Sequence, residues 1–384
     1  MTIKKRDRYT KRETWDRKQE ITFHKISLTL RKTRVGMKLE AEEFLKLADK
    51  YPVVDVRSPK EFEQGHIPGA KSLPLFDNDE RAEVGTIYKR SGRYASILRG
   101  LDITGPKMSF FLKKGVAWAR GGRVLVHCWR GGMRSESMAW LFERAGLQAD
   151  TLIGGYKAYR HHIRELWSAK SPLVILGGMT GSGKTEILHE LQKSGEQVLD
   201  LEGVAHHKGS AFGAIGQEPQ PTNEQFENNL AAVWRSFDPV QPVWLEDESR
   251  AIGAVSIPEP LYKRMQQTPV VDIHVPRPER IKRLVSEYAC FEKEKLESAI
   301  HRISKKLGGQ NEKAALQALE NDDFETVADI TLWYYDKAYH NDLQKRENRK
   351  VFTLNLSADN PVGNAAEVRR FYREEVLKKE KLWT

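Results

Sequence analysis

Eight residues, Gly178-Met-Thr-Gly-Ser-Gly-Lys-Thr, constrain the fold of this chain more than any other stretch. They follow an apolar run, Leu173-Val-Ile-Leu, which predicts a buried strand. Ile187, Leu188 and Leu191 come next, with the spacing of an amphipathic helix. Strand, glycine loop and helix in this order are the context that a Walker A phosphate-binding loop requires, so we predict a parallel α/β domain here.

The residue types in this loop explain how it would hold a phosphate chain. Glycines allow backbone N–H groups to wrap around phosphate oxygens, a lysine neutralises their charge, and a threonine hydroxyl can bind Mg²⁺. The residues predicted to bind phosphate are Gly178, Gly181, Ser182, Gly183, Lys184 and Thr185.

Two further apolar runs end in acidic residues that are candidates for the same Mg²⁺ ion. The runs Val198-Leu-Asp-Leu-Glu and Val243-Trp-Leu-Glu-Asp predict strands whose carboxyl ends lie near the glycine loop. No metal site is certain, and we expect no tightly bound cofactor. The possible Mg²⁺ ligands, or residues that support the ligands, are Asp200, Glu246 and Asp247, with Glu202 close by.

A second strand-loop-helix pattern surrounds one of the two cysteines. Val124-Leu-Val predicts a strand that is buried on both faces and delivers Cys128 to the end of a sheet. Two glycines and two arginines follow, and Ser135 is placed to cap the next helix.

The surroundings of Cys128 favour a nucleophile. Backbone N–H groups of a glycine loop attract an anion, and Arg130 and Arg134 add positive charge that favours the thiolate. We therefore predict that Cys128, Arg130 and Arg134 are catalytic. Arg134 follows Cys128 by six positions, the phosphatase spacing, whereas common sulfurtransferase loops have five. Loop length alone leaves a persulfide carrier and a phosphatase both open.

The length and charge of the chain indicate its organisation. We place two α/β domains at residues 37–166 and 167–384, after a basic extension at residues 1–36. Twelve basic and four acidic residues lie within residues 1–34, which accounts for eight of the ten net positive charges of the chain. Such an arm either binds RNA phosphates or is a solvated tail, and the sequence favours neither.

Several absences point to a cytoplasmic protein. No apolar run is long enough to span a membrane, and the charged first residues do not form a signal peptide. Two cysteines without a metal-binding spacing suit a reducing compartment.

A helical pattern occupies residues 280–349 and is followed by Val351-Phe-Thr-Leu-Asn-Leu, which predicts a last strand. We therefore predict a helical insertion in the second domain. Basic residues alternate with aromatic ones in this insertion, a mixture that would suit either RNA binding or ordinary helix packing.

Three motifs in the first domain resemble rhodanese-like domains. They are the opening signature Asp55-Val-Arg-Ser-Pro with Gly65-His-Ile-Pro-Gly-Ala, the Cys128 loop, and the closing turn Leu152-Ile-Gly-Gly-Tyr-Lys-Ala-Tyr. The resemblance covers roughly residues 38–165. It implies a parallel sheet with the cysteine at the carboxyl ends of its strands.

The combination of both loops resembles the tRNA 2-selenouridine synthase family. Further motifs that carry the likeness are Asn78-Asp-Glu-Arg-Ala-Glu-Val-Gly-Thr-Ile-Tyr, Asp200-Leu-Glu-Gly, Gly209-Ser-Ala-Phe-Gly and Glu246-Asp-Glu-Ser-Arg. The implied fold is a rhodanese-like domain followed by a P-loop NTPase-like α/β domain with a helical insertion.

The resemblance also implies a reaction, the replacement of sulfur by selenium in wobble 2-thiouridine of tRNA. Geranyl diphosphate would first alkylate the sulfur, and selenophosphate would then supply selenium. Cys128 would carry or deliver selenium, Arg130 and Arg134 would hold the anionic donor, and the glycine loop would hold the diphosphate. The residues alone also allow a sulfurtransferase coupled to a nucleotide-binding domain, or a tRNA-binding regulatory module.

Overall fold

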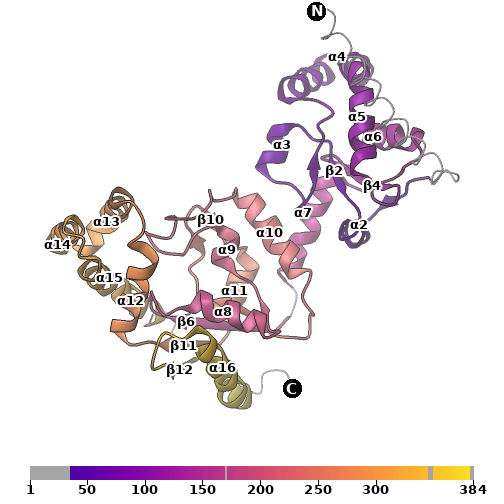
Figure 1. Cartoon of the computed structure of the whole chain (residues 1–384). Helices are drawn as coiled ribbons and strands as arrows, with labels where there is room; N and C mark the ends of the chain where they lie inside the picture. Colours follow the sequence, from indigo (N-terminus) through magenta and orange to yellow (C-terminus); the bar gives the residue numbers. More distant parts are fainter. Residues whose placement is uncertain (1–34, 169–170, 345–348, 381–384) are drawn as a thin grey trace, which may run out of the picture. The chain divides into compact units, whose positions relative to one another are not determined.

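The computed structural model of the chain describes residues 35–168, 171–344 and 349–380. It divides into two compact units, Met1–Ile163 and Arg164–Thr384. Each unit is built on a five-stranded parallel sheet with helices packed on it (Figure 1). The predicted α/β fold class is confirmed. The arm at residues 1–34 lies outside the described residues, so both alternatives for it, RNA binding and a solvated tail, stay open.

The sheet of the first unit has the strand order β1-β5-β4-β2-β3, which places β4 at its centre. Because β4 is flanked on both sides, its residues 124–126 are fully buried, as predicted. The elements of this unit are β1 Lys38–Leu39, α2 Ala41–Ala48, β2 Val53–Asp55, α3 Pro59–Gln64, β3 Lys71–Ser72, α4 Asn78–Thr104, α5 Met108–Trp118, β4 Arg123–His127, α6 Met133–Arg144, β5 Gln148–Leu152 and α7 Gly155–Leu166.

Helix α4 is a hairpin of two helical halves. Gly92, with φ of +84°, breaks the helix in a backbone conformation that other residues rarely adopt. Arg99 in the second half pairs with Glu83 in the first at 2.6 Å, and Lys107, just beyond the hairpin, pairs with Glu80. The two halves therefore run back along each other.

A buried ion pair fixes the carboxyl end of β2. Arg57 and Asp55 are both fully buried, and the Arg57 guanidinium bonds Asp55 Oδ2 and the carbonyl oxygen of Gly65, each at 2.6 Å. The guanidinium also lies 3.7 Å from the ring centroid of Tyr156, in a cation–π contact. Asp55 and Arg57 of the opening rhodanese-like signature thus stabilise the fold through these contacts.

Replacing Arg57 by methionine is expected to destabilise the first unit by about 3 to 5 kcal/mol, because Asp55 would stay buried without its partner. The measurement is hydrogen exchange of the β2 and β4 amides in the full chain. Arg99→Met, which removes an exposed ion pair, is the control and is expected to leave exchange unchanged. Equal protection in both variants would contradict a structural role for Arg57.

The sheet of the second unit has the order β12-β11-β6-β8-β7, so β6, which leads into the phosphate loop, lies at its centre. A small antiparallel hairpin, β9 and β10, is separate from it. The elements are β6 Leu173–Gly178, α8 Lys184–Lys193, β7 Gln197–Val198, α9 Leu201–Ala205, α10 Asn223–Trp234, β8 Val243–Glu246, β9 Ala251–Ile252, β10 Val255–Ser256, α11 Glu259–Gln267, β11 Val270–His274, α12 Arg277–Tyr288, α13 Lys293–Leu307, α14 Gly309–Glu320, α15 Phe324–Gln344, β12 Val351–Asn355, α16 Pro361–Phe371 and α17 Leu377–Glu380.

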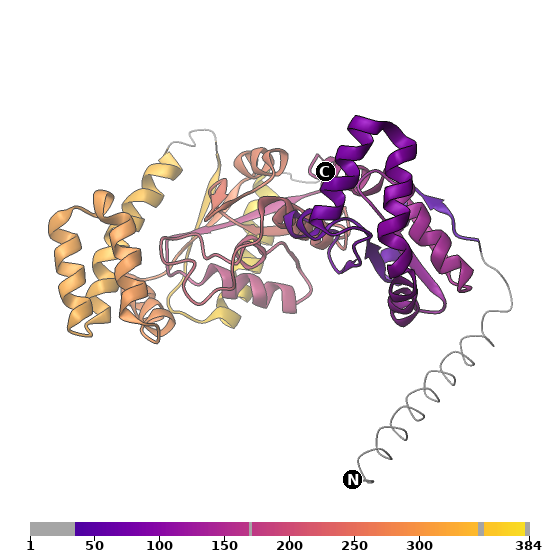
Figure 2. The same ribbon diagram turned by 90° about the horizontal axis from the view of Figure 1, so that it is seen from above.

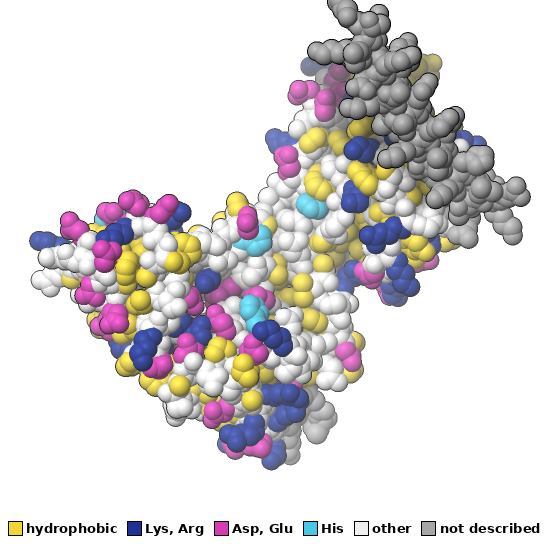
Figure 3. Space-filling model, viewed as in Figure 1, with side chains coloured by type: hydrophobic (Ala, Val, Ile, Leu, Met, Phe, Trp, Pro, Cys, Tyr) yellow, Lys and Arg dark blue, Asp and Glu magenta, His cyan; other side chains and the backbone are white. Residues whose placement is uncertain are grey.

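Helices α12–α15 follow β11 and precede β12 in the sequence, and they lie side by side (Figure 2). They form their own core with the segment that follows α9, built on Leu296, Ile300, Leu307 and Phe212. Acidic and basic side chains intermingle over these helices on the face drawn in Figure 3. The buried aliphatic positions show that these helices pack on one another, whereas RNA binding by the basic and aromatic residues of the insertion stays a prediction.

Across the described residues, no helix has the length and apolar character needed to cross a membrane.

Candidate functional site

The predicted strand-loop-helix around Cys128 is confirmed. Cys128 follows β4, the central strand, and α6 begins at Met133. Its side chain is buried, and Sγ lies 3.2 Å from the hydroxyl oxygen of Ser135 and 3.8 Å from the carbonyl oxygen of Gly132. A parallel strand end beside a helix start is a common place for reactive groups.

The prediction that Ser135 caps α6 was wrong. The helix begins two residues before it, with Gly132 in the capping position. The Ser135 hydroxyl instead bonds the Gly132 carbonyl oxygen at 3.0 Å and faces the thiol. Ser135 therefore belongs to the site around Cys128, a role that its place in the sequence did not reveal.

The closing turn and the first residues of α7 hold the cysteine loop in place. The backbone N–H of Tyr156 donates to the carbonyl oxygen of Cys128 at 2.8 Å, and that of Lys157 donates to Trp129 at 3.0 Å. Gly155 has φ of +59°, and a Cβ atom there would lie 2.4 Å from the Cys128 carbonyl oxygen. Gly131, with φ of +65°, approaches the same turn equally closely. Two glycines thus allow the two loops to interlock.

The two arginines of the loop have different surroundings. Arg134 pairs with Glu61 of α3 at 3.0 Å, and Glu61 also pairs with Arg81. Burial raises the pKa of Glu61, but the two arginines outweigh it and keep this pKa below its ordinary value. Arg130 is exposed and forms no ion pair with a described residue. Both arginines line the cavity that contains Cys128.

The phosphate loop has the geometry that its sequence predicted. Gly181 and Gly183 have φ of +79° and +74°, which turn the chain into α8. The Lys184 ammonium bonds the Gly178 carbonyl oxygen at 2.8 Å across the loop. The Ser182 hydroxyl is buried without a hydrogen-bond partner among the described residues. An oxygen-rich ligand in this loop would satisfy it.

Three carboxylates gather at the end of the loop. The Thr185 hydroxyl donates to Glu246 Oε1 at 2.7 Å and lies 3.2 Å from Glu202 Oε2. A Cβ atom at Gly209 would lie 2.9 Å from both Glu202 and Glu248, which places these two side chains together.

Burial is the main reason why these carboxylates hold protons tightly. Burial and the charge of Glu248 raise the pKa of Glu202 to about 8. Burial and the charge of Glu246 raise the pKa of Glu248 to about 7, and the pKa of Glu246 also lies well above its ordinary value. Such a cluster suits a cation, although no group of three or more His, Cys, Asp and Glu side chains in the described ranges forms a metal site.

The other two acidic residues predicted near the Mg²⁺ ion, Asp200 and Asp247, have other partners. Asp247 forms a buried ion pair with Arg349 at 2.8 Å. Asp200 caps α9 by accepting the N–H of Gly203 at 2.7 Å, and it also contacts His189. Of the acidic residues predicted near the loop, the structure brings Glu246 and Glu202 to Thr185, whereas Asp200 and Asp247 have structural partners.

An apolar cavity opens beside the phosphate loop. It is lined on one side by the loop from Gly178 to Glu186 and on the other by helices α12, α13 and α15. The apolar residues of this second side are Leu284, Val285, Ala289, Leu296, Phe324, Val327 and Ala328. These residues come from the insertion, and their shared cavity was not predicted from the sequence.

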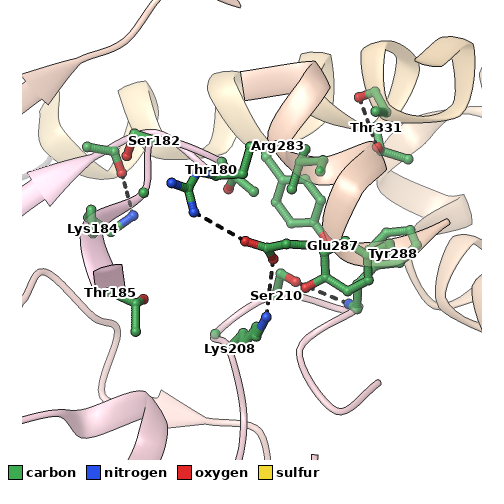
Figure 4. Close-up of a pocket in the computed structure, with 18 of the residues that line it drawn as sticks. Thr180, Ser182, Lys184, Thr185, Lys208, Ser210, Arg283, Glu287, Tyr288 and Thr331 are labelled. Carbon is green, nitrogen blue, oxygen red and sulfur yellow. Dashed lines mark hydrogen bonds and ion pairs between the residues drawn. The ribbon is translucent and has the colours of Figure 1, made fainter. Parts of the chain in front are cut away.

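Two cations and a carboxylate lie at the junction of the loop and the cavity (Figure 4). Glu287 of α12 lies 3.2 Å from the Lys208 ammonium and 3.5 Å from the Arg283 guanidinium. Arg283 also reaches over the loop, since a Cβ atom at Gly183 would lie 2.9 Å from it. Lys208 is therefore a further candidate for phosphate contacts, and so is Arg283, which also pairs with Glu186 at 2.8 Å and with Asp359. Only the fold brings them to the loop.

Comparisons with known proteins cover both units. Residues 171–371 match the family described as "tRNA 2-selenouridine synthase AAA domain", and residues 40–162 match the "Rhodanese-like domain". Among curated relatives, the tRNA 2-selenouridine synthase of Bordetella petrii is 36% identical over 343 residues, which cover 78% of this chain and 89% of that protein. That of Serratia proteamaculans is 34% identical over 360 residues, covering 83% and 92%.

The chain belongs to the tRNA 2-selenouridine synthase family. The family predicted from the sequence motifs is confirmed, and so is the prediction that the chain is an enzyme. The members named above match over nearly their whole length, so the rhodanese-like and phosphate-loop units occur together in the family. The match favours this family over the sulfurtransferase and the regulatory module that the residues alone left open.

Proposed function

We propose that the chain converts wobble 2-thiouridine of tRNA into 2-selenouridine in two steps. The thiouridine sulfur first displaces diphosphate from geranyl diphosphate, giving S-geranyl-2-thiouridine. Selenium from selenophosphate then replaces the geranylated sulfur. The first step would use the phosphate loop of the second unit and the second step the Cys128 loop of the first. Reduced Cys128 and Cys290 suit the cytoplasm as the compartment.

The observation that carries the first step is the apolar cavity next to the phosphate loop. Geranyl diphosphate has a diphosphate at one end and a ten-carbon apolar chain at the other. The loop from Gly178 to Thr185 supplies N–H groups and Lys184 for the diphosphate, and α12, α13 and α15 supply the apolar lining. The aliphatic and aromatic lining suits an isoprenoid better than the sugar and base of a nucleotide.

The residues of this loop would favour departure of the leaving group. A bond forms between sulfur and C1 of the geranyl group, the C1–O bond breaks, and the N3 proton of thiouridine is released. Negative charge grows on the departing diphosphate, where Lys184 and the loop N–H groups can stabilise it. Arg283 lies over the same loop and would add to this stabilisation.

The carboxylates at Thr185 fit a magnesium ion. Thr185, Glu246 and Glu202 offer the oxygen ligands that Mg²⁺ prefers, and one oxygen of Glu246 is buried without a hydrogen-bond partner among the described residues. A Mg²⁺ ion bound there would neutralise the diphosphate. This proposal replaces the less specific set of Asp200, Glu246 and Asp247.

Replacing Glu246 by glutamine is expected to raise the Mg²⁺ concentration for half-maximal geranyl transfer by about tenfold or more, because a ligand charge is lost. The measurement is the rate of geranyl transfer over a Mg²⁺ titration. Asp200→Asn keeps the helix cap and is expected to leave the titration unchanged. A titration that Glu246→Gln does not alter would exclude Glu246 from the ion.

Electron counting restricts how Cys128 takes part in the second step. Moving selenium from selenophosphate onto the thiolate as a selanyl-sulfide would leave phosphite, or need an oxidant, to balance. Attack of the Cys128 thiolate on phosphorus instead releases selenide without a change of oxidation state and leaves a phosphorylated cysteine that water hydrolyses. Arg130 and Arg134 lie where they can hold the phosphate group.

Mass spectrometry of nucleosides tests the proposed function. Wobble 2-thiouridine tRNA is incubated with the protein, geranyl diphosphate and selenophosphate, and each co-substrate is omitted in turn. We expect S-geranyl-2-thiouridine without selenophosphate and 2-selenouridine with both. Unchanged 2-thiouridine in every mixture, with folded protein, would overturn the proposal.

A further inference from the structure

A second cavity lies at the thiol of Cys128, in the other unit from the phosphate loop. The α4 hairpin forms one side of it, and Cys128, Trp129, Arg130 and Met133 form the other. Its volume is about 970 Å³. Pockets of several hundred Å³ hold ligands of drug size, whereas selenophosphate has only five heavy atoms. The donor anion alone therefore leaves most of this cavity unexplained.

The walls of the cavity are largely apolar. Val84 comes from the first half of the α4 hairpin, Ile97 and Leu101 come from the second half, and Phe76 and Met133 add further apolar side chains. Leu101 and Met133 are 61% and 44% exposed. Large apolar side chains left open to solvent inside a hollow indicate a ligand with an apolar part.

The cavity also contains cations without carboxylate partners. Lys89, Arg93 and Arg130 line it and form no ion pair with a described residue. By contrast, Arg81 and Arg134, which line it too, are both paired with Glu61. Unpaired cations beside apolar walls fit a ligand that combines an apolar group with phosphates, such as a modified nucleotide within an RNA strand.

S-geranyl-2-thiouridine in tRNA has this composition. The geranyl chain is attached to the sulfur that selenium replaces, so the chain must begin within a few ångströms of the reacting C2 atom. We infer that the cavity between the α4 hairpin and the Cys128 loop is a second isoprenoid subsite, which holds the geranyl chain while selenium displaces the thioether. This inference rests on the proposed function.

The bonding changes give the subsite a defined role. Selenide attacks C2, the C2–Se bond forms and the C2–S bond breaks, while the selenide proton moves to N3. Geranyl thiolate leaves with the electron pair of the C2–S bond, so no oxidant or reductant is required. The apolar walls bind both the thioether and the departing thiolate chain, and they keep that chain out of water.

Filling the cavity tests the subsite. The variant Ile97→Trp adds bulk at a lining position, and Leu98→Trp adds the same bulk at the next residue, which is 47% exposed and does not line the cavity. Each full-length variant reacts with selenophosphate and tRNA that carries either S-geranyl- or S-methyl-2-thiouridine. The measured quantity is the ratio of the two single-turnover selenation rates.

We expect Ile97→Trp to lower the geranyl-to-methyl rate ratio about tenfold or more, because only the long chain needs the cavity. Leu98→Trp should keep the wild-type ratio. Gly85→Leu is a second filling variant for the case that Ile97→Trp does not fold, since a Cβ atom at Gly85 meets no atom within 4 Å and a helix gains from losing glycine.

The outcomes separate this inference from the proposed function. The subsite would be overturned if both filling variants kept the wild-type rate ratio. This includes the case in which they slow the geranyl and methyl substrates equally. Wild-type protein that selenates neither thioether would overturn the proposed function and the subsite together.

Discussion

Replacement of Cys128 by alanine is expected to stop selenation of geranylated tRNA while geranyl transfer continues. The variant lacks the only sulfur within the described part of the first unit's cavity that can attack the donor, and removal of a nucleophile typically costs about 10³-fold or more. S-geranyl-2-thiouridine should therefore accumulate when both co-substrates are present. Nucleoside mass spectrometry measures this product directly.

Cys290→Ala is the matched control for that result. Cys290 is exposed on the second unit, and its thiol contacts only the carbonyl oxygen of Glu287 among the described hydrogen bonds. Its loss should leave selenation unchanged. Normal selenouridine in the Cys128→Ala protein would exclude Cys128 from the reaction.

Replacement of Lys184 by alanine is expected to have the opposite effect on the two steps. Geranyl transfer should fall by about 10²- to 10³-fold, because the leaving diphosphate loses a positioned positive charge. Selenation of tRNA that already carries the geranyl group should proceed at the wild-type rate. Single-turnover assays of the separate steps distinguish the two effects.

Lys193→Ala provides a control at the other end of the same helix. Lys193 pairs with Glu190 on the surface, so its removal changes the charge of α8 without touching the loop. Undiminished geranyl transfer in Lys184→Ala would remove the phosphate loop from that step. Loss of both geranyl transfer and selenation in Lys184→Ala would indicate structural damage beyond the phosphate loop.

Local sequence patterns predicted both loops because each loop is continuous in the chain. The buried run before Cys128 and the glycines before Lys184 specify strand, loop and helix within about twenty residues. The same reasoning assigned Ser135 the wrong role, that of the cap of α6. A serine at the start of an amphipathic stretch is a common cap, but Gly132 already takes that position.

The assignment of the acids could not be made from spacing. Glu246 and Asp247 are neighbours, and successive side chains at a strand end point to opposite faces. Glu246 consequently meets Thr185, whereas Asp247 meets Arg349, which lies 102 residues further along the chain. Because Arg349 pairs with Asp247, Glu246 is the acid that contacts Thr185 of the phosphate loop.

The apolar cavities were hidden for a related reason. Leu284 and Val327 look like ordinary helix-packing positions, and only the return of the insertion to the phosphate loop gives them a shared cavity. In the first unit, the break at Gly92 lies 36 residues before Cys128, whose loop shares a cavity with the hairpin. Apolar periodicity predicts helices, but it does not specify which parts of their apolar faces stay open as cavity walls.

The interlock between the cysteine loop and the first residues of α7 links the placement of the Cys128 thiol to the order of protein synthesis. A nascent chain that has emerged only as far as α6 already contains Cys128 but lacks Tyr156, whose backbone N–H holds the Cys128 carbonyl oxygen. The loop reaches its final form only after β5 has joined the sheet and Lys157 has left the ribosome. The full set of contacts that positions the thiol therefore requires the chain up to Lys157, close to the end of the first unit.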